Sequence, residues 1–154
     1  MLQEASAAFY DLIIVDAFSS DAIPLHLVTR EAMELYRSKL RPGGAIVFHV
    51  SNRNLTLAPF VAATAAQLSL QTFASEKLKL TKAERDEGKA PTDLAVVTDN
   101  AALLQDLALS YPAGKWRSIT PVPGEPGVKP WTDDFSNIVQ AAWMKFNERR
   151  RPEE

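Results

Sequence analysis

Residues 10–24 read Tyr-Asp-Leu-Ile-Ile-Val-Asp-Ala-Phe-Ser-Ser-Asp-Ala-Ile-Pro, an apolar run that ends in acidic and hydroxyl side chains. Because no polar residue alternates with Leu12 to Val15, both faces of the strand that they predict must be covered, as in a parallel sheet flanked by helices. Ligands of such sheets bind beyond the carboxyl ends of the strands, where Asp16 lies. Asp16 is therefore a candidate site residue, although aspartate and serine at a strand end also form turns and cap helices.

Segments with strand-like and helical spacing alternate along the following residues. We expect strands at 9–15, 45–50, 70–75 and 93–98, and helices at 29–39, after Thr56 and at 100–109. Thr29 and Thr56 are the expected caps of the first two helices, and the Pro42-Gly43-Gly44 turn ends the first. This order predicts an α/β fold with a mostly parallel sheet, flanking helices and right-handed crossovers.

Two later segments are expected to lack continuous secondary structure. The segment 77–92 is charged and without apolar periodicity, which predicts a flexible loop, and 112–130 is rich in proline and glycine. A last amphipathic segment is expected to place these side chains on one side: Phe135, Ile138, Val139, Ala142, Trp143 and Phe146. We expect residues 1–154 to form a single domain.

The composition argues against several functional classes. The 154 residues include 17 lysines and arginines against 19 acids, a formal charge of -2 that favours neither nucleic acid nor an anionic membrane as partner. Cysteine is absent and the two histidines are not clustered, so neither thiolate catalysis nor a metal site is expected. No apolar run approaches the roughly 20 residues of a bilayer span, and no secretion signal opens the sequence, so a cytoplasmic location without membrane contact is expected.

A glycine-rich turn after the first strand, which nucleotide-binding α/β domains use, is missing. The six glycines lie at positions 43, 44, 88, 114, 124 and 127, none of them in a strand-to-helix turn of the Gly-x-Gly type. The sequence therefore resembles the second half of such a domain. Its first strand is expected to have an unpaired edge, available to a partner.

Several blocks of the sequence resemble the spermidine-synthase-like proteins, polyamine aminopropyltransferases. The similarity covers roughly residues 9–140 and is greatest to the bacterial branch in which this domain often follows a transporter-like membrane region. The blocks are residues 10–24, His26-Leu-Val-Thr-Arg-Glu-Ala32, Leu40-Arg-Pro-Gly-Gly44, Phe48-His-Val-Ser-Asn-Arg53 and Trp131-Thr-Asp-Asp-Phe-Ser136.

The resemblance implies a partial Rossmann-like fold of the class I S-adenosylmethionine-dependent methyltransferase type, of which this chain is the carboxyl-terminal half. The implied activity is aminopropyl transfer from decarboxylated S-adenosylmethionine to a diamine such as putrescine. Decarboxylated S-adenosylmethionine, or S-adenosylmethionine itself, is then a co-substrate, and no tightly bound cofactor is expected. Without the donor-binding half, the chain is expected to be inactive alone.

Aminopropyl transfer requires acidic residues because the acceptor amine, with a pKa of about 10.4 like that of lysine, is protonated at neutral pH and cannot attack. One carboxylate can remove the proton while a second holds the distal ammonium. The resemblance makes Asp16 the general base and Asp21 the ammonium anchor. The two residues are five positions apart, whereas the corresponding aspartates of the family are three apart.

The other candidate substrate-binding residues are His49, Trp131, Asp133 and Asp134. His49 could line the pocket at the end of the second strand or be a buried imidazole with satisfied hydrogen bonds. Trp131 and the two aspartates could cover a cationic polyamine, or form a helix cap beside a packed tryptophan. His26 is expected to make a structural hydrogen bond near the helix start. No residue is assigned to cofactor binding.

Two other functions stay open on the sequence. The same sheet supports methyl transfer from S-adenosylmethionine to a small acceptor, because a fold does not determine its reaction. Alternatively, the chain is a non-catalytic interaction module that uses the edge of its first strand. Its partner would then be a second copy of itself or the missing amino-terminal half.

Overall fold

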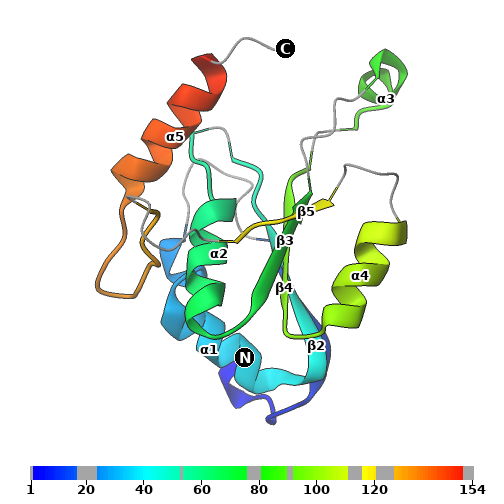
Figure 1. Cartoon of the computed structure of the whole chain (residues 1–154), viewed down its shortest axis with the longest axis vertical. Coiled ribbons are helices and arrows are strands. Elements are labelled where there is room, and N and C mark those ends of the chain that lie inside the picture. Colours follow the sequence, from blue (N-terminus) through cyan, green and yellow to red (C-terminus); the bar gives the residue numbers. More distant parts are fainter. Residues whose placement is uncertain are drawn as a thin grey trace.

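The computed structural model describes residues 2–16, 24–52, 54–75, 81–89, 92–110, 116–120 and 127–150. A five-stranded sheet with strands in the order β1-β2-β4-β3-β5 forms its centre (Figure 1). The strands are β1 (Tyr10–Val15), β2 (Leu40–His49), β3 (Gln71–Ser75), β4 (Leu94–Thr98) and β5 (Trp116–Ser118). The helices are α1 (Arg30–Lys39), α2 (Ala58–Gln67), α3 (Lys82–Asp86), α4 (Ala101–Ser110) and α5 (Ile138–Arg150), with short 3-10 turns at Leu2–Glu4 and Leu25–Leu27.

The prediction of a mostly parallel sheet is wrong, because the sheet is mixed. β1 and β2 pair in parallel, whereas β4 is antiparallel to both β2 and β3, and β5 is antiparallel to β3. A parallel neighbour requires a crossover, which α1 supplies between β1 and β2. The connection from β3 to β4 contains the five-residue α3, which buries no side chain. The chain therefore returns as an antiparallel strand.

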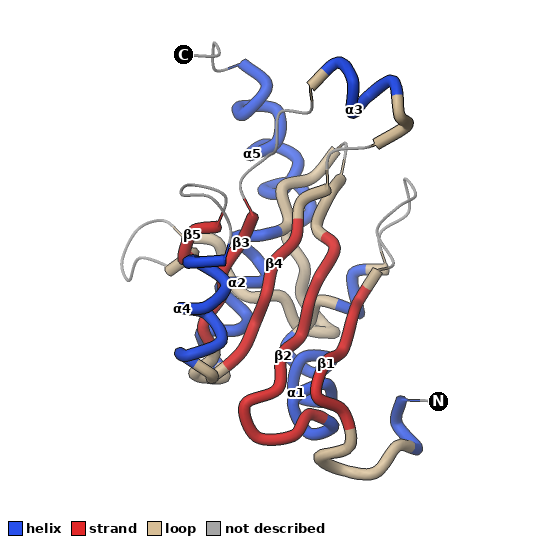
Figure 2. The backbone as a smooth tube through the Cα atoms, turned by 90° about the vertical axis from the view of Figure 1, so that its right-hand side faces the viewer, coloured by secondary structure: helices blue, strands red, loops and turns tan. Residues whose placement is uncertain are grey.

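Helices cover the two faces of the sheet unequally. Figure 1 shows α1 and α2 on one face and α4 on the other. Alternate residues of β2 divide between these layers: Ile46 and Phe48 belong to the larger core under α1 and α2, and Val47 packs with Leu104 of α4. Figure 2 shows β1 at the edge of the sheet, away from α4. Of the elements described, none pairs with the outer edge of β1.

The starts of the helices test the predicted caps. The Thr29 hydroxyl accepts a hydrogen bond from the Ala32 amide at 3.3 Å, which confirms the predicted cap of α1. The predicted cap of α2 is wrong, because the helix begins at Ala58 without a side-chain cap. Thr56 instead donates its hydroxyl hydrogen to Glu148 Oε1 at 2.8 Å, which ties the start of α2 to α5.

Of the apolar residues of the last amphipathic segment, Ala142 packs against the core, whereas the five larger side chains are exposed. Val139 is 80% exposed and Trp143 62% exposed, whereas Ala141 is fully buried. The Ala141 carbonyl accepts a hydrogen bond from the Thr56 amide at 3.2 Å, so the helix approaches its neighbours through its smallest side chain. The helix predicted from the spacing exists, but its inward face is a different one.

The Pro42-Gly43-Gly44 segment lies inside β2 rather than in a turn before it. Tyr10 of β1 pairs with Leu40, and Leu12 pairs with Ala45, so β2 has three more residues than β1 between these two pairs. The extra residues form the bulge at the start of β2 in Figure 2. Gly43 has a φ of +77°. A Cβ on Gly44 would lie 2.9 Å from the Asp11 carbonyl oxygen, so the two strands approach too closely there for any side chain.

Gly44→Ala is therefore expected to destabilise the protein by about 1–3 kcal/mol, since the clash is with backbone that cannot move independently. Urea denaturation measures the change in the free energy of unfolding. Gly88→Ala is the comparison for backbone strain without a clash, because Gly88 has a positive φ but no neighbouring atom within 4 Å. A cost of Gly44→Ala below about 0.5 kcal/mol, the size of an exposed substitution, would show that the close approach of the strands contributes nothing.

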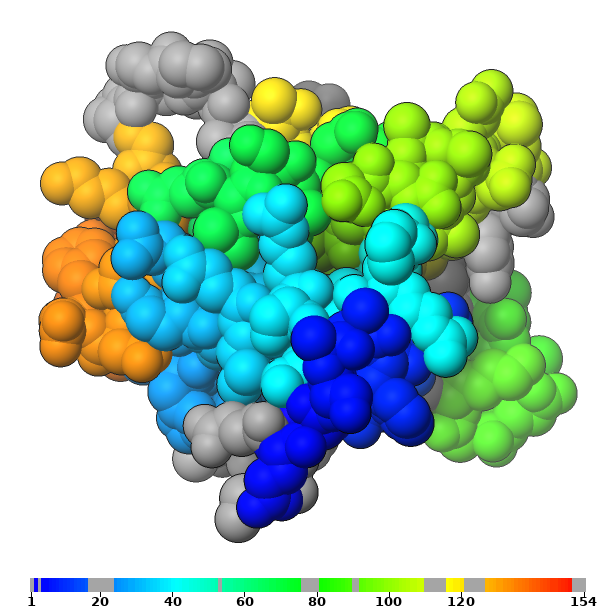
Figure 3. All heavy atoms as spheres, turned by 90° about the horizontal axis from the view of Figure 1, so that it is seen from below, coloured from blue at the N-terminus to red at the C-terminus, as the bar shows by residue number. Residues whose placement is uncertain are grey.

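The first residues pack against the lower end of the sheet. Figure 3 shows them in blue against the cyan start of β2. The Lys39 ammonium donates to the Ala5 carbonyl at 2.6 Å, and the Phe9 amide donates to the Lys39 carbonyl at 2.9 Å. Among the described residues, every helix is too short or too polar to cross a bilayer.

Candidate functional site

Asp16 and His49 meet where β1 and β2 end. The two strands are parallel and Val15 pairs with Phe48, so the next residues of both strands lie side by side. Nδ1 of His49 is 2.7 Å from Oδ1 of Asp16. The Asp16 side chain is 62% exposed and the His49 side chain 22% exposed. The structure thus brings together two residues that the sequence marked independently.

This contact determines what the carboxylate can do. When Nδ1 of His49 carries a hydrogen, it donates to Oδ1 of Asp16, which fixes the orientation of the carboxylate and leaves Oδ2 available. An exposed carboxylate held in this way can accept a proton from a ligand that carries N–H or O–H groups. His49 is then a positioning residue for Asp16.

The pair lies on the less covered face of the sheet. Along β1, Leu12 and Ile14 point to the same face as Asp16, and their side chains are 50% and 65% exposed. On this face α4 packs with side chains of β2, β3 and β4, and Figure 2 shows it on the far side of β2 from β1. An apolar and accessible surface therefore adjoins the Asp16 carboxylate.

Asp21, the predicted ammonium anchor, lies outside the described residues, as do all of 17–23. Its role stays a prediction.

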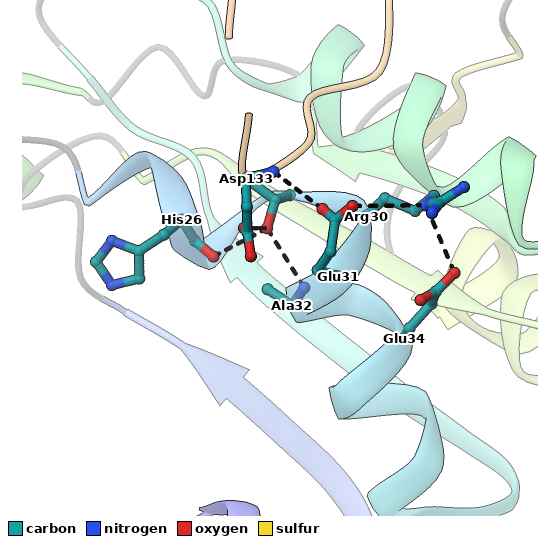
Figure 4. Close-up of polar contacts among 7 residues, drawn as sticks. His26, Arg30, Glu31, Ala32, Glu34 and Asp133 are labelled. Carbon is teal, nitrogen blue, oxygen red and sulfur yellow. Dashed lines mark hydrogen bonds and ion pairs between the residues drawn. The ribbon is translucent and has the colours of Figure 1, made fainter. Parts of the chain in front are cut away.

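Trp131 and Asp133 belong to a second group, at the start of α1. Figure 4 shows Asp133 beside His26 and Glu31. The Thr29 hydroxyl lies 2.7 Å from Oδ1 of Asp133 and 3.1 Å from the His26 carbonyl, so its single hydrogen can serve either acceptor. The Asp133 amide donates to Glu31 Oε2 at 3.0 Å, and the Arg30 amide donates to the Trp131 carbonyl at 2.8 Å. These bonds attach the 131–133 segment to the first turn of α1.

The Trp131 ring is fully buried and lies 4.6 Å from the Phe60 ring, centroid to centroid. Its faces contact protein, and its Nε1 has no hydrogen-bond partner in the described structure. In this geometry Trp131 serves the core rather than an exposed cation site. Asp134 is exposed beside it, and its role in substrate binding stays a prediction.

The remaining polar residues near the strand ends bond to backbone amides, Asn52 within a local turn and Ser51 across to the residue before β4. Asn52 Oδ1 accepts from the amides of Asn54 and Leu55, both at 2.8 Å, and Ser51 Oγ accepts from the Asp93 amide at 2.6 Å. The expected structural bond near the start of α1 is made by the backbone carbonyl of His26, while its imidazole is exposed (Figure 4). Within the described part of the chain, no hydrogen bond or ion pair joins these groups to Asp16.

Asp133→Ala is expected to lower the free energy of unfolding by about 1 kcal/mol, because it removes a hydrogen bond to the residue that caps α1. Asp134→Ala is the matched control, since the described structure gives its side chain no partner and exposed substitutions change stability by less than about 0.5 kcal/mol. Thermal unfolding of the two variants measures the difference. A larger loss for Asp134→Ala would contradict the assignment of Asp133 to the helix start.

Asp93 and Arg117 line a cavity in this part of the structure. Neither was identified from the sequence as a candidate site residue. Asp93 precedes β4, and only the antiparallel direction of that strand brings it beside Val50 at the end of β2. Arg117 lies in a segment in which no element was expected. Neither residue can be identified as a site residue from the sequence unless the pairing of the strands is known.

Comparison with known proteins agrees with this geometry at the level of the fold. No protein-family model matches the chain, and no curated protein matches it. Among solved structures, the chain is similar to "a probable spermidine synthase from Corynebacterium glutamicum ATCC 13032", with a TM-score of 0.53 and 17% sequence identity over 88% of this chain. The match covers 52% of that protein, so the chain spans about half of its length. The chain therefore has a spermidine synthase-like α/β fold.

Proposed function

We propose that the chain is the acceptor-side half of an aminopropyltransferase, in which Asp16 is the general base. The observation that carries the proposal is the exposed Asp16 carboxylate, held by His49 at 2.7 Å at the end of the edge strand of a spermidine synthase-like fold. Strand ends of such sheets are where ligands bind.

In the proposed reaction, the diamine nitrogen attacks the donor carbon attached to the sulfonium of decarboxylated S-adenosylmethionine. A carbon–nitrogen bond forms, the carbon–sulfur bond breaks, and its electron pair neutralises the sulfur, which leaves as a thioether. Asp16 Oδ2 takes the proton that the attacking nitrogen loses. Asp21 holds the distal ammonium, and Asp134 adds negative charge that attracts the cation.

The donor-binding half is proposed to join the chain at β1. Leu12 and Ile14 are exposed on one face of this edge strand, and Phe9 before it is 56% exposed. Edge strands with exposed apolar side chains pair readily with other chains. Neither donor binding nor turnover is expected from the isolated chain.

Product analysis by mass spectrometry tests the proposal. The chain is incubated with putrescine and either decarboxylated S-adenosylmethionine or S-adenosylmethionine, alone and with the amino-terminal half of a spermidine synthase. We expect spermidine from the decarboxylated donor in the complemented sample, which contains the chain together with the amino-terminal half. Methylated amine from S-adenosylmethionine would favour the methyltransferase alternative, and the absence of both products from the complemented sample would contradict the enzyme proposal.

The exposed edge of β1 also favours a second candidate function, a non-catalytic module that pairs through this strand with itself. Native mass spectrometry and titration calorimetry with the adenosyl donor separate the two. If the chain forms a stable oligomer and still does not bind the donor when the amino-terminal half is added, the result favours the module. A monomer that binds the donor when complemented would exclude it.

A further inference from the structure

A cavity of about 250 Å³ lies on the face of the sheet opposite to Asp16 and His49. Val50 of its lining belongs to the core under α1 and α2, whereas His49, the preceding residue, points to the α4 side. The cavity is bounded by the start of α2, the ends of β2 and β3, the strand β5 and the middle of α5. It is therefore separate from the proposed catalytic pair.

The walls of the cavity are mainly apolar. They are formed by Val50, Leu57, Pro59, Ala74, Ile119 and Met144, among others. These side chains come from five parts of the chain and suit a small aliphatic group rather than a nucleotide. Binding sites commonly combine such apolar walls with a few charged groups that fix the orientation of the ligand.

Asp93 supplies an unsatisfied acidic group. Its carbonyl accepts from the Val50 amide at 2.8 Å, which places Asp93 next to Val50 and its side chain on the cavity face. Oδ1 of Asp93 is buried and has no hydrogen-bond partner in the described structure. A buried carboxylate oxygen without a donor is unfavourable, so this atom suits a ligand that brings an N–H group.

Arg117 supplies a basic group on the same face. It pairs with Ala74 across β3 and β5, and directly opposed residues of antiparallel strands point to one side of the sheet. The described residues give its guanidinium no ion pair or hydrogen bond. The other two charged residues of the lining, Lys145 and Glu148, face each other at 3.8 Å. The cavity thus presents one acid and one base that are more than ion-pair distance apart.

We infer that this cavity binds a small zwitterion, an α-amino acid with an aliphatic side chain. The ammonium of the ligand meets Oδ1 of Asp93, and its carboxylate meets the Arg117 guanidinium, which can bind it in a bidentate manner. The aliphatic side chain lies against Leu57, Pro59 and Met144. A volume of about 250 Å³ fits a molecule of this size and is below the range typical of drug-sized ligands.

The test uses nuclear magnetic resonance of the chain with 13C-labelled methionine methyl groups, titrated with unlabelled L-leucine. Met144 lines the cavity, and Met33 is fully buried in the core and serves as the internal reference. We expect a saturable shift of the Met144 methyl resonance and no change at Met33. No saturable shift at Met144, or an equal shift at both methyl groups, overturns the inference.

Two monofunctional analogues separate the charges without any substitution. Isoamylamine is leucine without its carboxylate, and 4-methylpentanoate is leucine without its ammonium. Each is expected to bind at least about tenfold more weakly than leucine, which corresponds to about 1.4 kcal/mol. Equal affinity of isoamylamine would show a site for cations only and would overturn the zwitterion assignment.

Substitutions then locate the two contacts. Asp93→Asn, which preserves side-chain size, and Arg117→Gln, which replaces the guanidinium by a shorter neutral amide, are each expected to weaken leucine binding about tenfold or more. Asp99→Asn and Arg85→Gln are matched controls, because both residues are exposed and neither lines the cavity. Unchanged affinity in both cavity variants would contradict the site. Because leucine binding is measured from the Met144 methyl resonance, the result does not depend on the amine chemistry proposed for Asp16.

Discussion

Trp131→Ala is expected to lower the free energy of unfolding by about 3–5 kcal/mol, the largest stability effect that the structure implies. The ring has no exposed surface and packs at 4.6 Å against Phe60. Its removal leaves a cavity between α2 and the segment that holds the start of α1. Urea denaturation measures the loss, and a large effect identifies Trp131 as a core residue.

Trp143→Ala is the matched control, because Trp143 is 62% exposed on α5. Its expected cost is below about 1 kcal/mol. Trp131→Phe is expected to cost less than Trp131→Ala, since it keeps an aromatic contact with Phe60 and removes the buried Nε1–H that has no partner in the described structure. If Trp131→Ala were no more destabilising than Trp143→Ala, the ring would not be part of the core.

Asp16→Asn is expected to reduce aminopropyl transfer by the complemented protein about 10²–10⁴-fold, the usual contribution of a general base. Asparagine keeps the size of the side chain and can still contact His49, but it cannot take the proton of the attacking amine. The rate of spermidine formation at saturating putrescine measures the effect. The free energy of unfolding is expected to stay nearly unchanged, because the Asp16 side chain is 62% exposed.

Asp11→Asn is the control for this substitution. Asp11 lies on the same strand, 76% exposed and paired with Arg41 at 2.9 Å, at the opposite end from Asp16. Its replacement is expected to leave transfer unchanged. Equal rates for Asp16→Asn and the unmodified protein would remove Asp16 from the mechanism.

Local patterns predicted most helices and strands of this fold. Thr29 caps α1 because its hydroxyl reaches an amide three residues later, a relation that is visible in the sequence. The apolar runs of β2 and β4 form inner strands of the sheet, and the apolar run of β1 forms an edge strand that pairs in parallel with β2. The prediction of a mostly parallel sheet was wrong for β4, because the direction of this strand depends on what the connection after β3 packs against. That is a tertiary property.

The site was predictable only in part for the same reason. Asp16 follows the apolar strand β1 and His49 is the last residue of β2, so both could be placed at strand ends, but their contact depends on the parallel pairing of β1 with β2. The bond between Thr29 and Asp133 joins residues 104 positions apart, and nothing in their spacing indicates it. α5 shows the converse error, since its apolar spacing predicted a buried face that the structure leaves exposed.

The central claim is that the Asp16–His49 pair binds a cationic amine. The most direct test is 15N resonance of the two imidazoles in the complemented protein during titration with putrescine, because the sequence contains only His26 and His49. The account predicts a saturable shift at His49 that disappears in Asp16→Asn, with no shift at the exposed His26. Putrescine that leaves His49 unchanged, or that shifts both imidazoles equally, would contradict it.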